Sequence, residues 1–105
     1  MATGILGQSA PAATTYTTVY TVPAATTATV TVSVCNRGVS SSTVRIAITD
    51  TATPLNSEFI EYESSLASYG VLERSGIVMN AAKRVVVYTS SANLSVSVYG
   101  FEEAA

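Results

Sequence analysis

"ATVTVSVCNRG", residues 28–38, decides the fold class of this chain. Its first seven residues alternate strictly between apolar residues (Ala or Val) and hydroxyl-bearing ones (Thr or Ser). Successive side chains of a strand point to opposite faces of the sheet, so this period of two predicts a strand with one buried face. The alternation stops at Cys35, and Asn36 and Gly38 are residue types that favour a turn.

The same period recurs along the chain in segments rich in Val, Thr and Tyr, which suit a pleated and half-buried surface. We expect a break in one of these segments at Gly76, and a short hairpin link at 90–93. Seven or eight short strands separated by turn residues predict an all-β fold, an antiparallel β-sandwich of jelly-roll or Greek-key type. The predicted strand segments are 14–22, 28–34, 43–49, 58–64, 71–79, 84–90 and 93–101.

Residues 1–13 lack this alternation and consist largely of Ala, Gly, Pro, Ser and Thr. We expect an extended N-terminal arm here, followed by a single sandwich domain over 14–105. The arm carries one apolar pair, Ile5 and Leu6, which would anchor it on a partner; an unanchored, floppy terminus is the alternative. Phe101, near the other end, is the third residue for which we predict a partner contact.

Charged residues make up only 11% of the chain, against roughly 25% in ordinary soluble domains. We interpret this shortage as a sign that partners cover much of the surface; the alternative is that neutral hydroxyl groups keep the chain soluble. Net charge is −2 and Lys83-Arg84 is the only basic pair, so no nucleic-acid partner is expected. No run approaches the roughly 18 consecutive apolar residues of a membrane helix, and no signal peptide is evident, so no membrane partner is expected either.

The composition lacks most of the residue types and motifs on which catalytic sites depend. The chain has no histidine, which removes the commonest general base and the commonest metal ligand. A single cysteine cannot build a zinc cluster, and no phosphate-binding or nucleophile-elbow motif occurs. We therefore expect no enzyme, no catalytic residue, no cofactor and no metal site.

Three groups of residues could still form a site. Cys35 has Arg37 two positions away, which would favour a thiolate, but we favour a small buried residue at a strand end. Glu61 and Glu63 share a parity, and we predict a solvated strand face in preference to an acid and base pair. We expect the tyrosines on predicted strands to supply core edge or interface area in preference to a sugar-binding face: Tyr16, Tyr20, Tyr62, Tyr88 and Tyr99.

Three motifs together resemble a family of small virion structural proteins of tailed bacteriophages. They are Y-T-V-P-A at 20–24, V-C-N-R-G at 34–38 and Y-x-S-x-A-N-L-S-x-x-x-Y-G-F-E at 88–102, and the similarity covers nearly the whole chain. The resemblance implies a β-sandwich that is assembled in many copies on a virus particle. It carries over no catalytic or ligand-binding residue.

The composition and the resemblance lead to one functional expectation. The chain is expected to be a capsid decoration or cement protein, made in the host cytoplasm and located in the virion. Its expected partners are copies of itself, with a trimer as one candidate homo-oligomer, and other virion proteins such as the major capsid protein. The alternatives are a neck, tail, baseplate or fibre component, or a carbohydrate-binding module for host adhesion.

Overall fold

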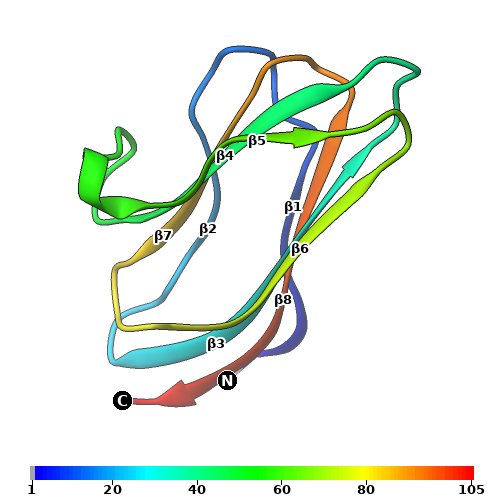
Figure 1. The fold of residues 1–105 in the computed structure, drawn as a ribbon. Coiled ribbons are helices and arrows are strands. Elements are labelled where there is room, and N and C mark those ends of the chain that lie inside the picture. Colours follow the sequence, from blue (N-terminus) through cyan, green and yellow to red (C-terminus); the bar gives the residue numbers. More distant parts are fainter. Residues whose placement is uncertain (1) are drawn as a thin grey trace.

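The computed structural model describes residues 2–105, which form two four-stranded antiparallel sheets (Figure 1). One sheet has the strand order β1-β8-β3-β6 and the other the order β2-β7-β4-β5. Within the described residues no helix has the length and apolar character needed to cross a membrane. The elements are β1 (Thr3–Ser9), β2 (Thr17–Thr21), β3 (Thr26–Asn36), β4 (Ser42–Thr49), the 3-10 helix η1 (Asn56–Glu58), β5 (Phe59–Leu66), β6 (Val71–Met79), β7 (Arg84–Thr89) and β8 (Leu94–Ala104).

Strand β3 carries the alternation that predicts the fold, and its burial follows that alternation from end to end. Val30, Val32 and Val34 are buried between the sheets, while the hydroxyl-bearing residues between them lie on the outer face. Each such valine stabilises the fold by about 1.5–3 kcal/mol relative to an exposed one. The all-β, two-sheet prediction is therefore confirmed, and each of the seven predicted segments is found as a strand.

The core fills the space between the two sheets. Consecutive strands mostly alternate between sheets, and β4 with β5 is the one consecutive pair that is hydrogen-bonded within a sheet. The expected hairpin link at 90–93 is therefore wrong, because β7 and β8 belong to different sheets. The buried apolar residues of the core are Tyr20, Val22, Ala28, Val30, Val32, Val34, Val44, Ile46, Leu66, Met79, Val85, Val87, Leu94, Val96 and Val98.

The N-terminal segment is a strand of the sandwich and not the separate extended arm that was expected. Residues 3–9 pair with β8 as the edge strand β1, because the outer edge of β8 offers backbone groups that need partners. A register shift at Leu6 turns that side chain toward the core while its neighbour Ile5 stays exposed. Gly7 lies against β2 so closely that a Cβ atom would come 2.2 Å from the carbonyl oxygen of Val19. The segment thus closes one side of the sandwich.

Strand β6 runs through the position where a break was expected. Val30 and Val32 of β3 face Ile77 and Arg74, so β6 holds one extra residue in this interval. Gly76 takes up the bulge with a φ of 72°, a conformation that suits glycine. The strand therefore bends at the glycine and continues, which keeps both of its halves paired with β3.

Candidate functional site

Four aromatic rings and one arginine gather on the outer face of the sheet β2-β7-β4-β5. The ring centroids of Tyr16 and Tyr88 are 4.8 Å apart, those of Tyr16 and Phe59 are 6.4 Å apart, and those of Phe59 and Tyr62 are 5.0 Å apart. These are ordinary separations for interacting aromatic pairs. We call the four rings together with Arg45 the aromatic face.

Arg45 holds the aromatic face together. Its guanidinium carbon lies 4.3 Å from the ring centre of Tyr88 and 4.6 Å from that of Tyr62. Its Nε donates to a carboxylate oxygen of Glu63 at 2.6 Å, and its Nη1 donates to the Tyr16 hydroxyl at 2.9 Å. The hydrogen bond to Glu63 is the main reason why the pKa of Arg45 is raised above its usual value. The cation is thus fixed in place and its charge is balanced.

The sheet beneath the aromatic face is covered. Ala47 and Val86 stand opposite one another on β4 and β7 and point away from the core between the sheets. They are nevertheless at most 1% exposed, so neighbouring side chains shield them from water. Beside them, a shallow hollow of about 350 Å³ is lined by Asn56, Phe59 and Tyr62. The aromatic face therefore lies over buried apolar side chains, and the hollow at its side is open to solvent.

Irregularity in β5 separates the two glutamates that were expected to share a face. The register between β4 and β5 shifts twice, and Glu63 has a φ of 53°. Glu63 consequently reaches Arg45 on the outer face, whereas Glu61 pairs with Arg74 of β6 and the Ser64 hydroxyl. The Ser64 hydroxyl and then Arg74 lower the pKa of Glu61. The expected shared carboxylate face is therefore wrong, because the bulge changes the parity between the two residues.

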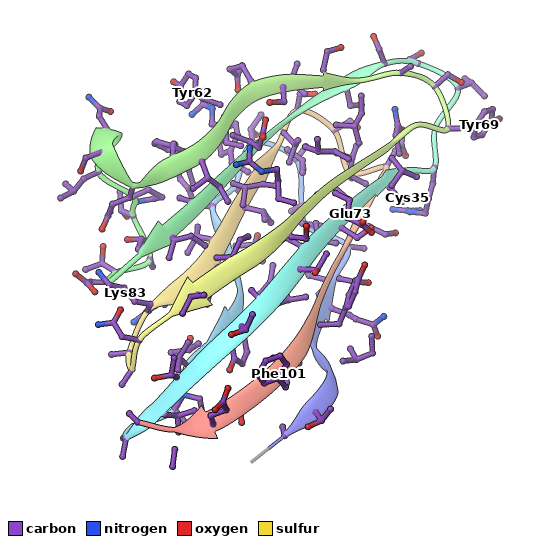
Figure 2. The ribbon with its side chains drawn as sticks, turned by 60° about the horizontal axis from the view of Figure 1, so that its bottom comes forward. Cys35, Tyr62, Tyr69, Glu73, Lys83 and Phe101 are labelled. Carbon is purple, nitrogen blue, oxygen red and sulfur yellow. The ribbon has the colours of Figure 1, made fainter. Side chains whose placement is uncertain are left out.

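The predicted partner-contact residues lie on the other sheet. Ile5 and Phe101 are 60% and 41% exposed on the outer face of β1-β8-β3-β6, on adjacent strands, whereas Leu6 points toward the core. Figure 2 shows Phe101 on this sheet and Tyr62 on the opposite one. A partner contact through these three residues stays a prediction, now with Leu6 on the opposite side of the strand from Ile5.

The Cys35 region is a structural junction. Cys35 is half-buried at the end of β3, so the strand end is as expected but the expectation of a buried cysteine is wrong. Asn36 is the buried residue: its amide donates to the carbonyls of Ser40, Leu66 and Ala67 at 2.9, 3.3 and 3.1 Å. Its own side-chain oxygen accepts from the backbone N–H of Gly38 at 2.9 Å.

Arg37 strengthens the same junction from the other side. Its Nη2 donates to the carbonyl of Ala92 at 2.9 Å, and its backbone N–H donates to the carbonyl of Asn93 at 2.8 Å. The turns after β3, β5 and β7 are thereby joined. Within residues 2–105, no group of three or more cysteine or acidic side chains could hold a metal ion.

A further polar contact ties the two sheets together at the opposite end. The hydroxyl of Tyr20 on β2 donates to a carboxylate oxygen of Glu102 on β8 at 2.5 Å. Burial first, and then the carboxylate, raise the pKa of Tyr20. The Tyr20 hydroxyl and the backbone N–H of Ala2 lower the pKa of Glu102.

Acid should weaken the fold partly through Glu102. Because its pKa is lowered by folding, its contribution is present above its unfolded pKa and is lost as pH falls through its folded pKa. We expect the urea midpoint of the wild type to fall more steeply between pH 5 and pH 3 than that of Glu102→Gln. Glu103→Gln, an exposed neighbour, is the control and should keep the wild-type slope. Parallel slopes for wild type and Glu102→Gln would contradict this assignment.

Comparisons with known proteins identify no relative of this chain. No family model, curated protein or solved structure matches the chain. The sequence analysis identified the tyrosines and Glu63 as candidates. It did not identify Arg45, the residue that contacts them. The available signal was the outward parity of Arg45 and Tyr88 in two segments with valine or isoleucine at the alternate positions.

Proposed function

We propose that this chain is a structural protein of a bacteriophage virion, a capsid decoration protein that binds the assembled shell. The observation that carries the proposal is the aromatic face. Tyrosine and arginine are enriched at protein interfaces, and rigid rings lose little entropy when a partner covers them. The balanced pair Arg45–Glu63 and the buried base beneath the rings suit burial against another protein.

We further infer that the eight strands wind as a jelly roll. This inference is supported by the two sheet orders, in which the first and last strands are neighbours and strands from both halves of the chain alternate. Jelly rolls occur in viral capsid domains and in lectins. Winding of this kind agrees with the virion resemblance of the sequence and does not by itself assign a function.

The other outer face offers a second surface for assembly. Along β3 and β8 it consists mainly of Thr and Ser, with Phe101 exposed on β8 and the apolar side chains of Ile5 and Val78 exposed on the edge strands β1 and β6. Few charges mean little repulsion between copies. One sheet would then face the shell and the other would face a neighbouring copy. Binding only the assembled shell would stabilise it by mass action.

Removing one exposed ring tests the proposal. We expect Tyr62→Ala to lower the affinity for shells at least about 30-fold, as loss of an interface hot spot does. The measurement is binding of the purified protein to particles that lack it, with bound copies counted by gel densitometry. Tyr69→Ala is the matched control: Tyr69 is 66% exposed against 58% for Tyr62, but it lies in the turn before β6 (Figure 2).

Copy number separates the virion positions. Hundreds of copies per wild-type particle would support decoration, whereas a few or some dozens would indicate a neck, tail, baseplate or fibre component. Equal binding by Tyr62→Ala and wild type would contradict the role given to the aromatic face.

A carbohydrate-binding module is the second candidate, and the hollow that Phe59 and Tyr62 of the aromatic face line together with Asn56 favours it. The rings of Phe59 and Tyr62 offer stacking surfaces and Asn56 offers an amide, which are the group types that line small-ligand sites. A glycan array probed with the isolated protein distinguishes the two functions. Specific glycan binding that is lost in Tyr62→Ala would replace the decoration proposal with host adhesion.

A further inference from the structure

We propose that β1 is an exchangeable strand: it leaves its own sheet and pairs with β8 of a second copy, while the second copy's β1 does the same. The partner is therefore another molecule of this chain. The exchange concerns the isolated protein and does not depend on any particle. Three observations carry it: the position of β1, its shallow packing and the strained loop that follows it.

Strand β1 is held less firmly than the strands beside it. It lies at a sheet edge and pairs with β8 alone. None of its residues is fully buried, and Leu6 is its apolar side chain against the core. Its side-chain hydrogen bond from Gln8 to the Ser97 hydroxyl is exposed and 3.3 Å long. Little buried surface is therefore lost when β1 detaches.

The loop from residue 10 to residue 15 contains strain that extension would relieve, while Tyr16 keeps its contacts in the aromatic face. Thr14 has a φ of 53°, in the left-handed region that β-branched residues strongly disfavour. This conformation reverses the chain so that β1 and β2 can reach the two sheets of one molecule. In an exchanged dimer the loop opens, and its six residues span up to about 21 Å. Extension therefore replaces a strained turn with ordinary backbone.

The exchanged dimer remakes the contacts that the monomer loses. In each copy the partner's β1 would occupy the same edge of β8, with Gln8 opposite Ser97 as in the closed chain. The strand contacts are common to both states, so the loop and the protein concentration decide the balance between them. Opening the loop costs the hydrogen bond from the Thr14 N–H to the Thr89 carbonyl and the burial of Pro11. Releasing the strain of Thr14 favours the dimer, and dilution favours the monomer.

The experiment uses engineered cysteines to show which chain supplies β1. In a Cys35→Ser background, one chain carries Gln8→Cys and another carries Ser97→Cys. The two positions face each other in the antiparallel register, where Cα atoms lie about 4.5–5.5 Å apart, within reach of a disulfide. The chains are unfolded together in urea, refolded at high concentration and oxidised. Exchange predicts a disulfide-linked dimer on non-reducing gels.

A matched pair controls for chance oxidation. Ser33 faces Ser97 from β3, one strand further from Gln8, so Gln8→Cys mixed with Ser33→Cys should give no linked dimer under exchange. We also expect Thr14→Gly to lower the linked fraction at least threefold, because glycine removes the strain of the closed loop, while Thr15→Gly leaves it within about 1.5-fold.

Three outcomes would overturn the exchange. They are equal linking in the two mixtures, no linking in either mixture, and a chain with both Gln8→Cys and Ser97→Cys that oxidises only within itself at every concentration. None of these outcomes bears on shell binding through Tyr62, so the two proposals fail separately.

Discussion

Asn36→Asp should destabilise the sandwich by about 3–5 kcal/mol at pH 7, the cost of a buried charge without a partner. The two side chains have nearly the same shape, but the aspartate lacks the amide N–H groups. In the wild type those groups satisfy the carbonyls of Ser40, Leu66 and Ala67. The substitution would place a negatively charged oxygen against the same carbonyls at a position that is 1% exposed.

The loss should depend on pH in a definite direction. Burial among carbonyl oxygens raises the pKa of an aspartate, since the protonated form can donate one hydrogen bond. The folded pKa then exceeds the unfolded one, so the variant is least impaired below the unfolded pKa and loses stability as pH rises through the folded pKa. We expect the urea midpoint of Asn36→Asp to recover part of its loss between pH 7 and pH 4.5.

Asn93→Asp provides the control for this measurement. Asn93 lies in the neighbouring turn and is exposed, so its substitution should change stability by no more than about 0.5 kcal/mol. If Asn36→Asp were as stable as Asn93→Asp at pH 7, the junction role of Asn36 would be wrong. A fall in the midpoint of Asn36→Asp relative to that of Asn93→Asp between pH 7 and pH 4.5 would contradict the pKa argument.

The strands could be predicted because a strand reveals itself locally. In β3 the alternation of valine with threonine and serine is visible without knowledge of any partner, and burial follows it residue by residue. The Cys35 junction was also correctly identified as a strand end. The importance of Asn36 over Cys35 could not be predicted, because two of the three carbonyls that its amide binds, those of Leu66 and Ala67, lie 30 and 31 residues further along the chain.

Features that depend on strand register or on sheet order could not be predicted from the sequence. A bulge at Glu63 places Glu61 and Glu63 on different sides of β5, although their spacing of two predicts the same side. No local sequence pattern indicates this bulge. Strand β1 has a composition typical of a loose terminus, and only the free edge of β8 makes it a strand. The aromatic face likewise exists because the sheet order brings β4 between β7 and β5, which places Arg45 between Tyr88 and Tyr62.

Gly100→Ala should destabilise the protein by at least about 3 kcal/mol, through strain and overpacking together. Gly100 has a φ of 150° and lies in β8 opposite Val30. A Cβ atom here would stand 2.0 Å from the carbonyl oxygen of Thr29 and 3.0 Å from the Cα of Val30. These are backbone atoms of β3, so no side-chain rotation can relieve the contact, and the two central strands of the sheet would have to separate.

Gly76→Ala isolates the conformational part of this effect. Gly76 also has a positive φ, 72°, but a Cβ atom there would meet nothing within 4 Å. Its substitution should therefore cost only about 1–2 kcal/mol of backbone strain. Urea unfolding of both variants measures the difference, which reports the close approach of β3 and β8. If Gly100→Ala and Gly76→Ala lost equal stability, β3 and β8 would lie further apart at Gly100 than the structure shows. In that case the continuous register between β3 and β8, on which the placing of both outer faces depends, would have to be redrawn.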